Sequence, residues 1–129
     1  MKQNSILNTE IKKAILNDLE VIAVLLFGSY ARNEKHYRDI DICLLLDKKY
    51  SNLQLSKKKL FYASLAKSPI EIHIFQQLPI YIRKRILKEG KVLLCKNQLP
   101  LYEIAFSTIK EFEFYEKLYN LYLNKIENG

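Results

Sequence analysis

Two short groups of residues in this sequence could carry out chemistry together. Gly28 and Ser29 end an apolar run, and Asp39 and Asp41 follow further along the chain. A glycine allows the backbone to approach a ligand closely, and the amides that open the next helical turn attract an anion. The Ser29 hydroxyl adds a further hydrogen-bond donor. We therefore expect Gly28 and Ser29 to hold a phosphate.

The two aspartates are predicted to bind a metal ion. Asp39 and Asp41 are two residues apart on a predicted strand, so their side chains point to the same face. Two neighbouring carboxylates repel each other unless a cation joins them, and Mg²⁺ prefers carboxylate and phosphate oxygens. The alternative is a pair of polar strand ends at a sheet margin. The apolar neighbours Ile40 and Ile42 argue against it, because uncompensated carboxylates among them would cost stability. The combination indicates metal-assisted phosphoryl or nucleotidyl transfer.

The elements that would position these residues follow from hydrophobic periodicity. A continuous apolar run predicts a strand buried on both faces, and alternation of polar and apolar residues predicts half-buried strands. Strands are predicted at Val21–Phe27, Asp39–Leu46, Ile70–Phe75 and Lys91–Cys95. Helices are predicted at Ile6–Leu19, Asn52–Ala66 with Ser51 as N-cap, Ile80–Glu89 and Leu101–Ile126, with one short helical turn after Ser29.

Alternation of helices with strands places the chain in the α/β (α+β) class, with a small mixed sheet flanked by helices. The length of 129 residues favours a single domain over residues 1–129. Its core is expected at residues 6–95, and its long C-terminal helix at residues 101–126.

A family resemblance rests on three short motifs. Gly28-Ser29, Ala31-Arg32 and Asp39-Ile40-Asp41-Ile42 resemble the signature of the nucleotidyltransferases of the DNA polymerase β superfamily, and in particular its minimal nucleotidyltransferase group. The resemblance implies the fold of that superfamily and transfer of a nucleoside monophosphate to a hydroxyl acceptor. AMP from ATP is expected, although another nucleoside triphosphate could serve, and Mg²⁺ is expected in a two-metal site.

Two positions depart from that signature. Asn33 stands where a glycine often follows Ala-Arg, and Arg38 stands where a serine often precedes the first aspartate. Asparagine tolerates a left-handed backbone better than most residues, so the turn can survive. Arg38 could change how the second strand begins or place a cation near the phosphates.

The resemblance also implies a third carboxylate, and Glu71 is the best candidate. It would be a metal ligand or the base for the attacking hydroxyl, and the alternative is a surface glutamate at a strand start. His73 shares its face and could contact metal, substrate or Glu71, although a structural histidine is the more common case. Arg32 could bind a nucleotide phosphate or pair with a carboxylate.

The last predicted helix has a wider apolar band than one core-facing side needs. It could pack across the domain, or it could form a homodimer or bind a partner. The resemblance implies a HEPN-type protein as partner, in a toxin–antitoxin pair, with AMP transferred to a tyrosine of the toxin. The rival interpretation is a non-catalytic module that neutralises a helical partner by contact.

The composition limits the remaining possibilities. Lys and Arg number 21 against 14 Asp and Glu, so the net charge of +7 favours partners that carry phosphate. A role in binding nucleic acid is less favoured because no arginine-rich stripe stands out. Cys43 and Cys95 lack metal-ligand spacing and are expected to be small core residues. Without a secretory signal or a membrane-length apolar run, the chain is expected to be cytoplasmic.

Overall fold

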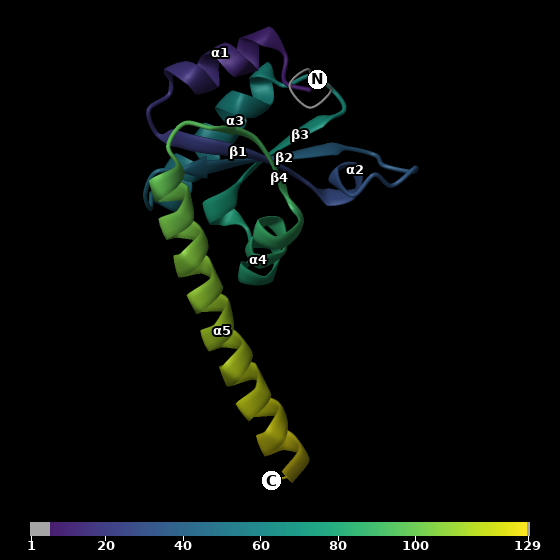
Figure 1. Cartoon of the computed structure of the whole chain (residues 1–129), viewed down its shortest axis with the longest axis vertical. Helices are drawn as coiled ribbons and strands as arrows, with labels where there is room; N and C mark the ends of the chain where they lie inside the picture. Colours follow the sequence, from purple (N-terminus) through teal and green to yellow (C-terminus); the bar gives the residue numbers. More distant parts are fainter. Residues whose placement is uncertain (1–5, 129) are drawn as a thin grey trace.

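A four-stranded mixed sheet forms the centre of the protein (Figure 1). The computed structural model describes residues 6–128, so residues 1–5 and 129 of the predicted domain lie outside it. The strands are β1 (Val21–Phe27), β2 (Ile40–Leu46), β3 (Ile70–Ile74) and β4 (Lys91–Cys95), in the order β3-β2-β1-β4. β1 pairs antiparallel with β2 and β4, whereas β2 pairs parallel with β3. This arrangement confirms the predicted fold class.

Helices cover both faces of the sheet. One face packs against α1 and α3, and the other packs against α4 and the start of α5 (Figure 1). The helices are α1 (Thr9–Asn17), α2 (Gly28–Ala31), α3 (Asn52–Leu65), α4 (Ile80–Glu89) and α5 (Gln98–Asn128), with a 3₁₀ turn, η1, at Phe75–Gln77. Most of α5 extends away from the body of the domain.

Helix ends depart from the predicted ranges where caps intervene. The Asn8 side chain accepts a hydrogen bond from the Ile11 amide and starts α1 later than predicted. The helix ends before extended Asp18, so Leu19, predicted on the apolar face, is 90% exposed. α5 begins three residues before predicted Leu101, since a proline such as Pro100 is tolerated in a first helical turn.

The helix α3 begins where the sequence predicted. The Ser51 hydroxyl accepts from the Gln54 amide, and the Gln54 side chain accepts from the Ser51 amide. This reciprocal capping box satisfies two backbone donors that the first helical turn would otherwise leave unpaired.

Alternation along β2 divides its side chains between two core clusters. Ile42, Leu44 and Leu46 pack on the side of α1 and α3, whereas Cys43 and Leu45 pack on the side of α4 and α5. Cys43 is a core residue, as predicted. Burial raises the pKa of its thiol, which therefore stays protonated. The same alternation directs Asp41 to the side of α4.

A charged network joins α1 to α3. The Asp18 carboxylate accepts hydrogen bonds from Lys58 Nζ at 2.8 Å and from Tyr62 Oη at 2.7 Å. Burial alone would raise the pKa of Asp18, but these hydrogen bonds outweigh burial and lower the pKa below its ordinary value of 3.8.

Asp18→Asn is expected to destabilise the fold by about 1–3 kcal/mol at neutral pH, because Lys58 and Tyr62 lose a charged acceptor. A carboxylate with a lowered folded-state pKa stabilises above its unfolded value, and that stability is lost as pH falls through the folded pKa. Urea unfolding from pH 7 to pH 3 should therefore show a difference between wild type and variant that shrinks in acid. Glu10→Gln, which changes an exposed acid in the first turn of α1, serves as the control. A constant difference across pH would contradict this role.

Among residues 6–128, no helix is both long enough and apolar enough to cross a membrane.

Candidate active site

A tight turn joins the central strand β1 to α2. Gly28 has φ of 81°, in the left-handed region, and a side chain there would overlap Asp41 Oδ2. Glycine is therefore required at this position for two reasons, the backbone angle and the close approach of the Asp41 carboxylate. Further along, Asn33 has φ of 61°, which agrees with the left-handed tolerance expected there.

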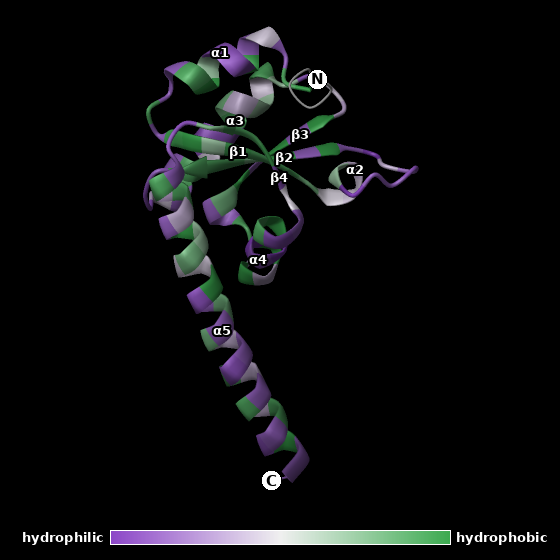
Figure 2. Cartoon of the chain, in the orientation of Figure 1, coloured by the Kyte–Doolittle hydropathy of each residue, from purple (hydrophilic) through white to green (hydrophobic). Residues whose placement is uncertain are grey.

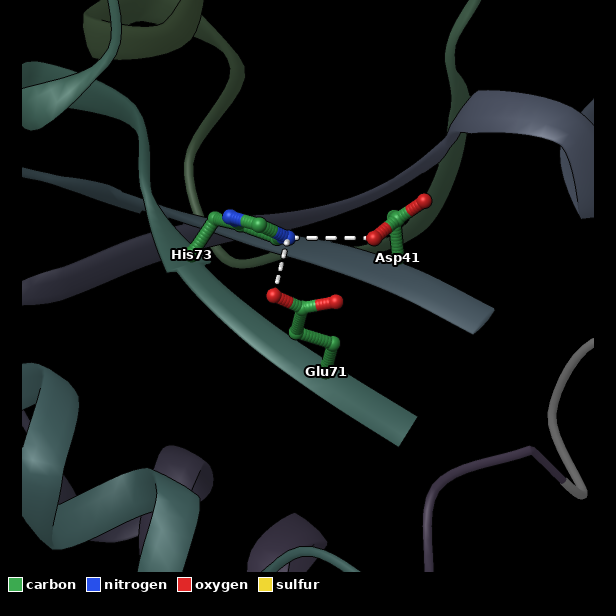
Figure 3. Close-up of side chains that lie close together, drawn as sticks. All are labelled: Asp41, Glu71 and His73. Carbon is green, nitrogen blue, oxygen red and sulfur yellow. Dashed lines mark hydrogen bonds and ion pairs between the residues drawn. The ribbon is translucent and has the colours of Figure 1, made fainter. Parts of the chain in front are cut away.

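Three polar side chains gather on the side of the sheet that faces α4. Asp41 lies opposite Glu71 in the parallel pairing of β2 and β3, and His73 lies two residues further along β3. His73 Nε2 is 3.1 Å from Asp41 Oδ1 and 3.9 Å from Glu71 Oε1. Figure 3 shows the imidazole directed between the two carboxylates. The structure therefore brings predicted Asp41 and Glu71 together, with His73 between them.

The His73 ring is held from a second side. The Phe27 ring packs against it edge-on, with ring centroids 5.2 Å apart. The imidazole is thus positioned by the last residue of β1 as well as by the carboxylates. The contact with Glu71 expected for His73 is present at 3.9 Å, and contact with metal or substrate stays a prediction.

The Asp41 carboxylate links this cluster to the turn at Gly28. Its Oδ1 faces His73, whereas its Oδ2 lies where a side chain on residue 28 would be. One carboxylate therefore contacts the phosphate-binding candidate through one oxygen and the histidine through the other.

A pocket of about 280 Å³ lies at this turn, between the sheet and α4. The predicted residues Gly28, Ser29, Arg32 and Asp41 all line it. α4 contributes the other wall, with the residues Ile82, Arg85, Ile86 and Glu89. The sequence had not assigned this wall to the site, although the spacing of these four residues places them on one helical face.

Arg32 already has carboxylate partners. Its guanidinium is 2.7 Å from Glu34 and 3.6 Å from Glu89. Of the two roles expected from the sequence, carboxylate pairing is present, and contact with a nucleotide phosphate stays a prediction. Arg85 is an exposed cation on the same pocket wall.

Asp39 stands apart from the other predicted ligands. It is exposed and directly precedes β2. Within the described part of the chain, Asp41, Glu71 and His73 form the group whose ligand atoms all lie within 4.8 Å of one another, and Asp39 is not in it. Metal binding by Asp39 therefore stays a prediction.

A larger cavity, of about 790 Å³, shares no residue with this site. It lies between α1, the end of β2 and α3, where the Asp18, Lys58 and Tyr62 network forms part of its wall.

A comparison with protein families identifies the chain. The family model described as polymerase beta, nucleotidyltransferase, matches residues 9–99. The chain belongs to this family. A Methanocaldococcus jannaschii protein whose assignment as a protein adenylyltransferase is provisional is 35% identical to this nucleotidyltransferase over 99 residues, which cover 76% of this chain and 75% of the relative.

Solved structures share the fold of this nucleotidyltransferase. A chain in the crystal structure of a toxin–antitoxin with AMP-PNP matches with a TM-score of 0.66 and 21% identity, over 94% of this chain and 99% of that one. A chain in the complex of a tri-AMPylated Shewanella oneidensis HEPN toxin with an MNT antitoxin matches with a TM-score of 0.64 and 18% identity, over 97% of this chain and 95% of that one.

The donor atoms of the cluster fit a divalent cation. Two carboxylates and an imidazole are ordinary ligands of such ions in proteins. Ligand atoms about 2.1 Å from one ion lie within about 4.2 Å of each other. The distances of 3.1 and 3.9 Å that join His73 to the two carboxylates meet this limit, and all three ligand atoms lie within 4.8 Å of one another.

Proposed function

We propose that this nucleotidyltransferase moves AMP from ATP to a hydroxyl acceptor in a reaction that depends on Mg²⁺. The observation that carries this proposal is the position of Asp41. Asp41 lines the pocket at Gly28 and Ser29 and also contacts His73. Metal ligands and a phosphate-binding turn thus meet at one carboxylate. Asp41, with Glu71 and Asp39, would hold the metal ions of a two-metal site beside the nucleotide phosphates.

Each residue has a role in this proposal. Gly28 and Ser29 hold the β- and γ-phosphates, and Arg32 exchanges a carboxylate partner for phosphate oxygen. Asp39, Asp41 and Glu71 would hold Mg²⁺. When bound, the metal ion stabilises the negative charge that develops on the α-phosphate.

Glu71 accepts the proton of the acceptor hydroxyl, and its half-exposed side chain is open to an acceptor from outside. A bond forms between the acceptor oxygen and the α-phosphorus. The bond from that phosphorus to the β-phosphate oxygen breaks, and pyrophosphate leaves.

The acceptor in this proposal is a tyrosine of a helical HEPN-type partner. Two relatives support it: one is provisionally a protein adenylyltransferase, and one solved complex holds an AMPylated HEPN toxin. The exposed part of α5 offers a surface for such a partner. From Glu113 to Asn128 every residue is exposed. Hydrophobic residues recur along this part of the helix among hydrophilic ones (Figure 2), and tyrosines lie among them. These hydrophobic residues and tyrosines are Phe114, Tyr115, Leu118, Tyr119, Leu121, Tyr122, Leu123 and Ile126.

Labelled ATP tests the reaction type. The chain and a candidate HEPN-domain protein are incubated with ATP labelled at the α- or the γ-phosphate. Nucleotidyl transfer is expected to leave the α-label on the protein and the γ-label in pyrophosphate. Label from the γ-phosphate on the protein would indicate a kinase and contradict the proposal. The same reaction without Mg²⁺ is the control, and mass spectrometry of tryptic peptides locates the modified tyrosine.

The exposed face of α5 also favours a second function, neutralisation of a helical partner by contact alone. The double variant Asp39→Asn, Asp41→Asn separates the two functions, because it leaves α5 unchanged. If catalysis is required, the double variant is expected to bind the partner but not to neutralise its toxicity in a growth assay. Full neutralisation by the double variant would support the contact mechanism instead.

A further inference from the structure

The carboxylates of the proposed metal site lie beside a nitrogen donor, His73 Nε2, to which the proposed function gives no role. His73 Nε2 is closer to Asp41 than to Glu71 and lies between them (Figure 3). The side chain of His73 is 18% exposed, so it is more sheltered than that of Glu71, which is 50% exposed. A metal ion held by both carboxylates would meet the imidazole nitrogen at the same place.

We propose that His73 Nε2 is itself a ligand of the metal ion and that this nitrogen makes the site prefer Mn²⁺ to Mg²⁺. The inference rests on the metal site of the proposed function, and it adds a ligand and a metal preference. The Phe27 ring, on the strand residue paired with Asp41, packs edge-on against the imidazole and restricts its rotation, which favours this orientation of Nε2.

The preference follows from ligand chemistry. Mg²⁺ is a hard ion that binds oxygen and dehydrates reluctantly. First-row transition-metal ions accept imidazole nitrogen more readily, and Mn²⁺ also accepts carboxylate oxygen. Adding one imidazole to two carboxylates should therefore raise the affinity for Mn²⁺ relative to the affinity for Mg²⁺.

The competing role for His73 is that of a positioning residue. Its Nε2 would then donate a hydrogen bond to Asp41 Oδ1 while the metal ion binds only oxygen. Both roles predict that loss of His73 weakens metal binding. They differ in whether the bound ion has a nitrogen neighbour.

Pulsed electron paramagnetic resonance of Mn²⁺ bound to the whole chain distinguishes the two roles. Wild type is expected to show ¹⁴N modulation from a directly bound imidazole, and His73→Gln is expected to lose it. Labelling histidine with ¹⁵N should change the modulation frequency. The chain has two histidines, so His36→Gln, which alters an exposed loop residue, is the matched control and should keep the signal.

Isothermal titration with Mn²⁺ or Mg²⁺ alone measures the preference. The ratio of Mn²⁺ to Mg²⁺ affinity is expected to fall in His73→Gln, because that variant lacks the imidazole nitrogen, and to stay constant in His36→Gln. Bound Mn²⁺ without ¹⁴N modulation, or an unchanged ratio, would overturn the role of His73 and leave the carboxylate site intact. Failure of wild type to bind either ion, or equal binding by Asp41→Asn, would overturn the metal site of the proposed function as well.

Discussion

Asp41→Asn is expected to slow nucleotidyl transfer by about 10²–10⁴-fold. A loss of about 3–5 kcal/mol of transition-state stabilisation corresponds to this range, which is typical of removing a metal ion or its effect on a developing charge. Asparagine keeps the size of the side chain and removes its charge. Asp41 lines the pocket and also contacts His73, so the variant weakens metal binding and phosphate positioning together.

Titration of ATP with and without Mg²⁺ checks the cause of this loss. Wild type should bind ATP more tightly with Mg²⁺, and Asp41→Asn should lose that dependence. Asp47→Asn is the control, because Asp47 follows the other end of β2, where its carboxylate contacts Tyr50. The melting temperatures of Asp41→Asn and wild type should be similar. Full activity in Asp41→Asn would remove the basis of the proposed mechanism.

Asp39→Asn tests whether the first aspartate of the motif is also a metal ligand. Asp39 is exposed and lies outside the close group formed by Asp41, Glu71 and His73 in the described structure. If Asp39 is a ligand as predicted, its variant should also lose Mg²⁺-dependent ATP binding in the same titration. An unchanged titration would remove Asp39 from the proposed site and leave Asp41 in it.

Gly28→Ala is expected to destabilise the fold by about 1–3 kcal/mol and to reduce transfer at least about tenfold. Alanine at φ of 81° is strained, and its Cβ would overlap Asp41 Oδ2. The Asp41 carboxylate must then move away from the turn. Displacement of a catalytic group by about 1 Å is enough to cost a large factor in rate. Urea unfolding measures the first effect, and labelled ATP measures the second.

A double-mutant cycle separates the two causes of this loss. In an Asp41→Ala background, the overlapping oxygen is absent, so only the backbone strain should remain. The loss of unfolding free energy caused by Gly28→Ala is therefore expected to be smaller in that background than in wild type, by at least about 0.5 kcal/mol. Ser29→Ala, in the same turn at an ordinary backbone angle, should leave stability nearly unchanged. Equal costs in both backgrounds would show that contact with Asp41 is not responsible.

Local patterns in the sequence predicted most elements of the sheet. The ranges Val21–Phe27 and Lys91–Cys95 match the observed strands, and Ser51 caps α3 as expected. These features depend on periodicity, propensity and capping over a few residues, which the sequence displays directly. The motif at Gly28, Ser29, Asp39 and Asp41 also identified the family that the comparison confirmed.

Tertiary structure decided which side chains meet. His73 reaches Asp41 across 32 residues of sequence, through the parallel register of β2 and β3 that the crossover helix α3 makes possible. Likewise, the packing of α4 on the sheet places Arg85 on the pocket wall and Glu89 beside Arg32. Periodicity along the chain assigns a residue to a face of its own element. Only the packing of elements against each other sets the distances between such faces. These distances decide which side chains lie close enough to form this candidate site.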